Sequence, residues 1–141
     1  MRRKLHRARG ICAVLAAFAA GAFCYLLWRA PVFSGGEGYE FSAGASSSAG
    51  VVRADDPVLY KLFTPVAGES ARYAGNRYEA LREAFSARLL FTEEACGVVN
   101  YYLYSPRLGG GVMLGGYLVN LHIAVSAEQT AVGTPLIFGG S

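Results

Sequence analysis

Two stretches near the C-terminus decide the fold: Val98–Ser105, with the sequence VVNYYLYS, and Tyr117–Ser126, with the sequence YLVNLHIAVS. Both are rich in aromatic and β-branched residues, which favour extended backbone. In the second stretch apolar and polar residues alternate, as expected for a strand that packs one face on a core. The pattern predicts two strands of an antiparallel sheet. Val119, Leu121, Ile123 and Val125 would face one way, and Asn120, His122 and Ala124 the other.

A helix is predicted over Arg77–Leu90, ahead of these strands. Asn76 is placed to cap it, and Glu79 follows three residues later, an arrangement typical of a helix start. Apolar residues recur in it every three or four positions, which predicts one buried face that packs on the sheet. A shorter helix is predicted over Val58–Phe63, because an acidic pair followed by Pro57 is a start signal.

The remaining elements complete the predicted fold class. The last extended segment contains Pro135, which cannot donate a ladder hydrogen bond, so we expect an edge strand or a bend there. The fold is α+β: an N-terminal transmembrane helix plus a small antiparallel sheet of about three or four strands, backed by one main helix. Extended segments are predicted at Tyr39–Ala43, Val51–Ala54, Glu69–Tyr73, Val112–Leu114 and Gln129–Phe138, with a small-residue loop at Gly44–Gly50.

The N-terminal segment predicts a membrane anchor. Residues 11–28 (ICAVLAAFAAGAFCYLLW) carry no formal charge, and as a helix they would be about 27 Å long, close to the thickness of the hydrocarbon core. Five basic residues lie in positions 1–10, which predicts that this end stays in the cytoplasm. We expect an uncleaved signal-anchor, although Ala20-Gly21-Ala22 resembles a cleavage site. The predicted organisation is a cytoplasmic segment 1–10, a transmembrane segment 11–28, a spacer 29–38 and an extracytoplasmic domain 39–141.

Charge and cysteine content restrict the function classes. Six of the 13 basic residues lie before position 30, so the remaining seven stand against all ten acidic residues, a net charge of −3. Nucleic-acid binding normally needs a basic patch on the domain itself, so such a partner is disfavoured. Cys96 is the one cysteine outside the anchor, which excludes a disulfide within the exported domain. We expect Cys96 to be a small, partly buried residue.

Catalytic candidates are few. Glu93 and Glu94 are adjacent carboxylates, but consecutive residues of an extended segment point to opposite faces, so the pair alone does not form a hydrolase site. His122 is the single histidine beyond the N-terminal segment, and the spacing that a metal site needs is missing around it. The sequence therefore predicts no catalytic residue, no metal and no cofactor.

A binding surface is the better prediction. Tyr102 and Tyr104 share one strand face, and Asn120 and His122 share the polar face of another strand. Aromatic rings beside polar groups suit a sugar, peptide or protein ligand, although cross-strand aromatic packing is the alternative. The predicted partners are the lipid bilayer, through residues 11–28, and an envelope protein or cell-wall ligand. A homodimer is also expected if Gln129–Phe138 forms a free edge.

The C-terminal strands also resemble a known family. Val119–Val125 (VNLHIAV), a turn, and then Val132–Phe138 (VGTPLIF) are similar to the end of the YwmB-like family of Firmicutes, and Asn100–Pro106 is similar to its preceding strand. Members are sometimes labelled TATA-box-binding-like, which implies a curved antiparallel sheet backed by helices. The label also implies DNA contact, against which the anchor and the acidic domain argue. The resemblance implies no catalytic residues.

These observations predict a single-pass membrane protein with a non-enzymatic binding or scaffolding domain outside the cytoplasm, in the envelope of a Gram-positive bacterium. The alternative is a cell-wall hydrolase that uses Glu93 or Glu94. A further alternative is nucleic-acid binding, as the family label suggests.

Overall fold

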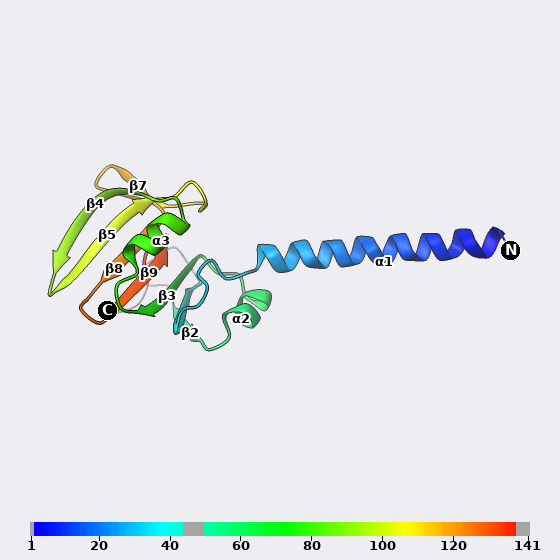
Figure 1. Cartoon of the computed structure of the whole chain (residues 1–141), viewed down its shortest axis with the longest axis horizontal. Helices are drawn as coiled ribbons and strands as arrows, with labels where there is room; N and C mark the ends of the chain where they lie inside the picture. The colour runs from blue at the N-terminus through cyan, green and yellow to red at the C-terminus, as the bar shows by residue number, and fades with distance from the viewer. Residues whose placement is uncertain (1, 44–49, 138–141) are drawn as a thin grey trace. The chain divides into compact units, whose positions relative to one another are not determined.

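The computed structural model describes residues 2–43 and 50–137, with side chains from residue 8 onward. The chain forms two compact units, Met1–Ala30 and Pro31–Ser141. Most of the predicted loop Gly44–Gly50 lies outside the described residues. Phe138, the last residue of the predicted strand Gln129–Phe138, also lies outside them. Figure 1 shows the elements of both units along the chain.

The first unit is a single helix, α1 (Arg2–Trp28). Its segment Ala8–Trp28 is long and apolar enough to cross a membrane. None of this segment is buried by other parts of the chain, so its apolar side chains have no protein environment around them. The segment predicted to cross the membrane is therefore helical in the structure. Its length and composition would also suit a signal sequence.

The second unit contains a seven-stranded antiparallel sheet in the order β2-β1-β3-β9-β8-β5-β4, larger than the predicted sheet. A two-stranded hairpin, β6 with β7, is separate from it. The strands are β1 (Gly38–Ser42), β2 (Val51–Ala54), β3 (Gly68–Ala74), β4 (Arg88–Ala95), β5 (Val98–Tyr104), β6 (Val112–Leu114), β7 (Tyr117–Val119), β8 (Leu121–Val125) and β9 (Gln129–Thr134). The α+β fold with an N-terminal apolar helix is thus confirmed.

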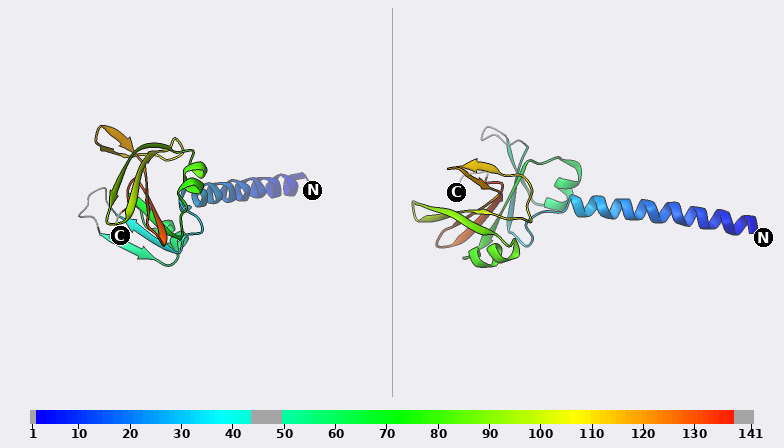
Figure 2. Two further views of the ribbon diagram at one scale, coloured as in Figure 1. Left: turned by 60° about the vertical axis from the view of Figure 1, so that its left-hand side comes forward. Right: turned by 90° about the horizontal axis from the view of Figure 1, so that it is seen from above.

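Two short helices, α2 (Pro57–Phe63) and α3 (Tyr78–Ala84), cover one face of this sheet. Tyr60 of α2 stacks on Phe41 of β1, and Tyr78 of α3 stacks on Tyr101 of β5. The strand register places Phe41 and Tyr101 on the same face, so both helices lie on it. The sheet curls around the core formed there (Figure 2). The core includes Phe33, Phe41, Ala71, Leu81, Leu103, Leu121, Ile123 and Val132.

Several local signals act as predicted. The start of α2 is capped by Asp56, whose carboxylate accepts a hydrogen bond from the Leu59 N–H at 2.9 Å. Asn76 Oδ1 likewise accepts from the Tyr78 N–H at 3.0 Å at the start of α3. These short polar side chains satisfy backbone donors that have no partner within the helix.

The predicted helix Arg77–Leu90 is wrong in its second half. Ser86 adopts a left-handed conformation, with a φ of 49°. The Ala87 N–H then donates to the Arg82 carbonyl, and the Ser86 N–H to the Glu83 carbonyl, which is the hydrogen-bond pattern of a Schellman helix end. Glycine usually occupies this position, and because serine occupies it here the sequence carries no stop signal. The chain leaves α3 there and continues into β4.

Two strand predictions also need correction. The predicted strand Tyr117–Ser126 is divided at Asn120: β7 pairs with β6, whereas β8 joins the large sheet. The strand after it is not an edge, because β9 pairs with β3 on one side and β8 on the other. The other expectation at Pro135, a bend, is confirmed: β9 ends at Thr134 and the chain bends at Pro135. The edges of the sheet are β2 and β4, and β4 contains a bulge between Leu89 and Phe91. The basis for a homodimer through Gln129–Phe138 is therefore lost.

Two further expectations differ from the structure. Cys96 is exposed, because it occupies the first position of the two-residue turn between β4 and β5, where Cys96 and Gly97 both have positive φ. The predicted spacer 29–38 is in part a folded element: Phe33 is 1% exposed and belongs to the core. The folded unit thus begins close to the end of α1 in the sequence.

Candidate functional site

The helix-free face of the sheet, opposite α2 and α3, carries the candidate site. One register row crosses all seven strands on this face: Arg53, Glu40, Ser70, Gly133, His122, Tyr102 and Phe91. The aromatic residues of this row lie on β8, β5 and β4, at one end. Charged residues lie on β2 and β1, at the other end. The middle of the row is occupied by small residues, Ser70 and Gly133.

The aromatic end is a continuous stack, which we call the aromatic row: Phe91, Tyr102 and His122. The ring centroids of Phe91 and Tyr102 are 4.5 Å apart, and those of Tyr102 and His122 are 4.6 Å apart. The interplanar angles are 19° and 10°, so the rings are nearly parallel. Tyr117 of the hairpin lies 5.9 Å from Phe91 and tilts against it. Such cross-strand aromatic pairs stabilise a sheet and hold the rings in a fixed orientation.

Two polar side chains accompany the aromatic row on the next register row. The Tyr102 hydroxyl donates to Glu93 Oε2 at 3.1 Å, and His122 Nε2 lies 3.1 Å from Asn100 Oδ1. The Ile137 N–H points to His122 Nδ1 at 3.4 Å. Since Nδ1 accepts from a backbone N–H, Nε2 must carry the proton and donate to Asn100. The hydrogen bonds therefore define one neutral tautomer of the imidazole.

Burial keeps the His122 ring neutral. Loss of hydration lowers the pKa of His122 from 6.5 to about 4. Burial also raises the pKa of Tyr102, and the hydrogen bond to Glu93 adds to this effect. Near neutral pH neither side chain changes its protonation state. Both ring nitrogens of His122 also have hydrogen-bond partners. The arrangement suits recognition through hydrogen bonds and ring contacts better than acid–base chemistry.

The structure brings together only part of the predicted binding surface. His122 and Tyr102 are in direct contact, as the prediction requires. Tyr104 lies two residues further along β5, opposite Arg88 of β4. Asn120 does not belong to the surface, because its side chain is buried, with 1% of its area exposed. The prediction that Asn120 shares an exposed polar face with His122 is wrong.

The Asn120 amide instead joins three backbone groups where β7 and β8 meet. Its Oδ1 accepts from the Ser105 N–H at 2.7 Å, and its Nδ2 donates to the carbonyls of Ser105 and Leu108 at 2.8 and 2.9 Å. The Ser105 hydroxyl donates to the Phe85 carbonyl, which extends this network to the end of α3. Asn120 therefore positions the loop after β5 and takes no part in a ligand site.

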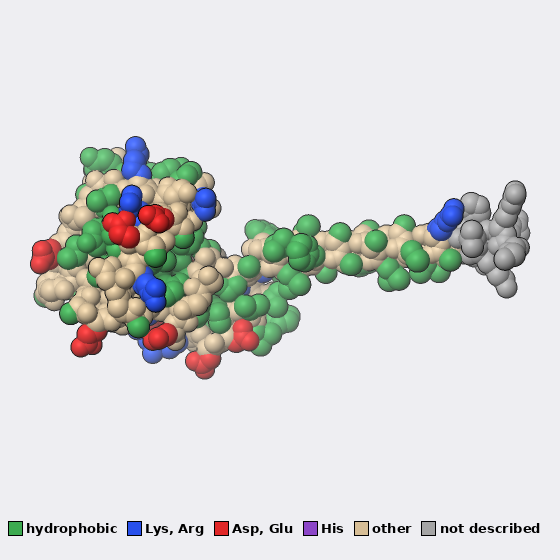
Figure 3. All heavy atoms as spheres, viewed as in Figure 1, with side chains coloured by type: hydrophobic (Ala, Val, Ile, Leu, Met, Phe, Trp, Pro, Cys, Tyr) green, Lys and Arg blue, Asp and Glu red, His purple; other side chains and the backbone are tan. Residues whose placement is uncertain are grey.

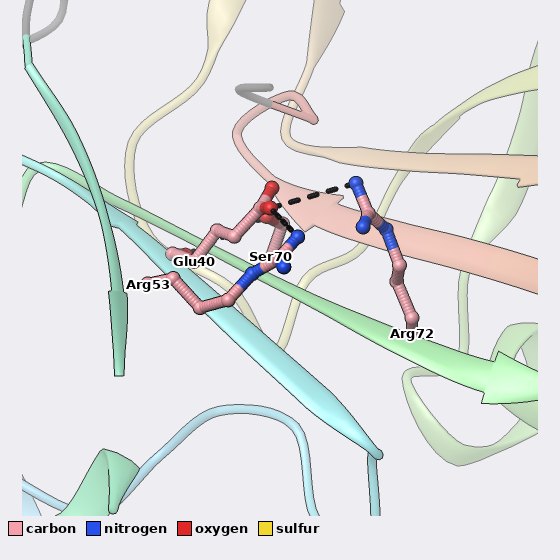
Figure 4. A network of polar contacts seen from close by, with 4 residues as sticks. All are labelled: Glu40, Arg53, Ser70 and Arg72. Carbon is pink, nitrogen blue, oxygen red and sulfur yellow. Dashed lines mark hydrogen bonds and ion pairs between the residues drawn. The ribbon is translucent and has the colours of Figure 1, made fainter. Parts of the chain in front are cut away.

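Sequence reasoning missed the charged end of the row. Glu40 Oε1 contacts Arg53 Nη2 at 2.9 Å and Arg72 Nη2 at 3.5 Å, and the Ser70 hydroxyl lies against the Glu40 backbone carbonyl (Figure 4). Both arginines and Asp55 line a pocket of about 340 Å³ next to this group. The carboxylate of Glu40 balances part of the arginine charge, which makes the network a structural link between β1, β2 and β3.

The carboxylate pair does not assemble a hydrolase geometry by itself. Glu93 lies opposite Asn100 and Glu94 opposite Val99, so the two side chains leave the strand on opposite faces. Glu93 accepts a hydrogen bond from the Tyr102 hydroxyl. Within residues 2–43 and 50–137, no group of three or more His, Cys, Asp or Glu side chains could hold a metal ion.

The pH dependence of stability should reveal the neutral His122. Because the folded state lowers the His122 pKa, the unfolded chain binds more protons between about pH 4 and 6.5, and stability falls as the pH falls through this interval. We expect His122 to account for about 2 kcal/mol of the stability lost between pH 7 and pH 4. Urea unfolding at both pH values should show this loss in the parent chain, and the loss should be smaller by that amount in His122→Gln. An equal pH dependence in both proteins would contradict the assignment.

Comparison with known proteins adds no relative: no family model matches the chain, and neither a curated protein nor a solved structure matches it.

Proposed function

We propose that the chain is a membrane-anchored, non-enzymatic binding protein of a Gram-positive envelope, with its second unit outside the cytoplasm. The apolar helix supports anchoring, and the basic residues at positions 1–10 favour a cytoplasmic N-terminus. The aromatic row with Glu93 and Asn100 is the observation that carries the binding role. The antiparallel sheet with helices on one face is the type of fold that the resemblance to the YwmB-like family implies, and membership of that family remains our proposal.

The shape of the site suggests the kind of ligand. The rings of the aromatic row stack on one another, so they present their edges, with the Tyr102 hydroxyl and the Glu93 carboxylate beside them. Glu93 is exposed and Tyr102 is half-buried. A row of rings that crosses β4, β5 and β8 fits an extended ligand, and in the envelope this means a peptide segment of a protein or a cell-wall polymer.

Removal of two side chains should test the binding role. We expect Tyr102→Ala combined with Glu93→Ala to reduce the recovery of envelope partners or cell-wall material about tenfold, a loss typical of an aromatic residue at an interface centre. The measurement is affinity recovery of the tagged full chain from envelope extracts. Thr92→Ala is the matched control, because Thr92 lies between Phe91 and Glu93 on the opposite face of β4. Equal recovery by the double variant and the control would reject this site.

Reporter fusions should test the topology. Alkaline phosphatase fused after Ser141 should be active in cells, because this enzyme folds only outside the cytoplasm, and the chain should stay in the membrane fraction at alkaline pH. Replacing the basic residues at positions 2, 3, 4, 7 and 9 with serine should reduce the activity, since these residues set the orientation. A reporter that is active only in the cytosol would overturn the extracytoplasmic placement.

A further inference from the structure

Helix α2 exposes apolar side chains and buries a charged one, the opposite of what an ordinary surface helix does. Its apolar residues Val58, Leu59 and Phe63 are exposed, Phe63 with 81% of its area, whereas its one charged residue, Lys61, is buried. Figure 3 shows apolar side chains gathered on the surface where α2 lies. Leu59 and Phe63 are one helical turn apart, so they form one continuous patch with Val58. We call Val58, Leu59 and Phe63 the α2 patch.

The inward side of α2 is fixed by strong contacts, which keep the patch turned outward. Lys61 Nζ donates to Glu69 Oε2 at 2.6 Å, and Tyr60 stacks on Phe41 with ring centroids 5.0 Å apart. Rotating the helix to bury Phe63 would break the ion pair and the aromatic stack together. The α2 patch is therefore a stable feature of the fold, and contiguous exposed apolar area of this kind marks a contact surface.

The chain itself restricts what can cover the α2 patch. Phe33 is only five residues after Trp28, the last residue of α1, and an extended chain of this length spans at most about 17 Å. Phe33 is buried in the second unit, and its N–H donates to Glu69 Oε1 at 3.2 Å. Glu69 is the residue that holds Lys61 of α2. A single carboxylate thus joins α2 to the point where the folded unit is attached to the anchor.

We propose that the α2 patch inserts into the interfacial region of the same membrane that α1 crosses. This proposal rests on the anchoring part of the proposed function. Because at most about 17 Å of chain joins Trp28 to Phe33, the folded unit cannot move far from the bilayer and α2 can reach its surface. The exposed leucine, valine and phenylalanine side chains match the acyl-chain boundary. Asp55 and Asp56 precede the helix, so apolar contact and not attraction to anionic lipid provides the binding. The second unit is then held at the membrane at two points.

Tryptophan fluorescence in zwitterionic vesicles can test the insertion. Trp28 is the one tryptophan of the chain, so Trp28→Phe gives a background without tryptophan for the full chain. Phe63→Trp and, separately, Leu59→Trp then report on the α2 patch. Met113→Trp is the matched control, because Met113 is an exposed apolar residue of β6, a strand of the hairpin between β5 and β8. Each protein is reconstituted into phosphatidylcholine vesicles with or without lipids that carry bromine on the acyl chains.

Brominated lipid should quench the Phe63→Trp and Leu59→Trp proteins to the same order as it quenches Trp28 in the parent chain, and it should leave the Met113→Trp protein at its unquenched level. Quenching of Trp28 without quenching of a tryptophan introduced at position 63 or 59 would overturn the insertion and leave the anchor intact. If Trp28 itself is not quenched, the anchoring part of the proposed function fails first, and the insertion fails with it. Near-ultraviolet circular dichroism of each variant checks that the fold is retained, and Leu59→Trp serves as the second reporter if Phe63→Trp does not fold.

Discussion

Lys61→Ala is expected to lower the free energy of unfolding of the second unit by about 3–5 kcal/mol, because it leaves the buried carboxylate of Glu69 without its cation. The two side chains are only 9% and 2% exposed and their charged atoms lie 2.6 Å apart. The charge that remains on Glu69 is strongly disfavoured at a buried position without its partner. The same carboxylate accepts the Phe33 N–H, so the link between the N-terminal segment of the unit and β3 is also weakened.

Urea unfolding of the detergent-solubilised full chain, followed by the near-ultraviolet circular dichroism of its tyrosines, measures this loss. The matched control is Arg82→Ala, which removes the exposed ion pair with Glu79 on α3 and should have a much smaller effect, because water screens an exposed pair. If Lys61→Ala and Arg82→Ala have the same small effect, the buried pair does not stabilise the fold. Far-ultraviolet spectra are less suitable, because α1 contributes to them whether or not the sheet is folded.

Asn120→Ala is expected to cost about 3 kcal/mol, since it takes away the side-chain partner of the buried Ser105 N–H and of the Leu108 carbonyl, each at a cost of about 1–3 kcal/mol. The Ser105 carbonyl loses its 2.8 Å bond from Asn120 and keeps the longer one from the Leu108 N–H. The loss falls where β7 separates from β8, so the loop after β5 and the hairpin should become less ordered. Asn120→Asp has nearly the same size but loses the amide donor, and it should be destabilised to a similar degree.

Amide hydrogen exchange gives the second measurement for Asn120. The Ser105 N–H, which donates to the Asn120 side chain, should lose its protection in Asn120→Ala, together with a lowered urea midpoint. In Asn120→Asp a carboxylate oxygen still accepts this N–H, so this variant should lower the urea midpoint and leave more of the Ser105 protection in place. Asn100→Ala is the matched control. The Asn100 side chain is hydrogen-bonded to the half-buried His122 ring, and this bond involves no backbone group. Stability of Asn120→Ala equal to that of Asn100→Ala would contradict the structural role.

Local chemistry made much of the fold predictable. The acidic pair before Pro57 predicts α2, and the aromatic and alternating stretches predict β5 and β8, because capping and side-chain alternation are properties of short segments. The end of α3 could not be predicted, since Ser86 takes a left-handed conformation that serine rarely adopts. The apolar spacing continues past this point, and it suits β4 as well as a longer helix.

The candidate site was predictable only in part, because it depends on register. Alternation places Tyr102 and His122 on strand faces, but the pairing that stacks them is set by contacts between distant segments. Phe91 was missed because the sequence around it follows a predicted helix, and the link between Glu40, Arg53 and Arg72 requires three strands that are separate in the sequence. Asn120 was misplaced because a polar residue in an alternating strand suits an exposed face equally well. Its burial comes from the loop after β5, whose backbone binds its amide, and this contact joins residues 12 to 15 positions apart.

The two borders of the sheet have a consequence for the behaviour of the chain in concentrated solution. A strand without a neighbour on one side can recruit another polypeptide, which is a common route to aggregation. Here β2 offers only four residues, and β4 is interrupted by its bulge and carries Arg88, Glu93 and Glu94. A foreign strand that approached β4 would meet an irregular ladder and charged side chains. One that approached β2 would find only a very short strand to pair with. These borders oppose fibril-like association of the folded unit.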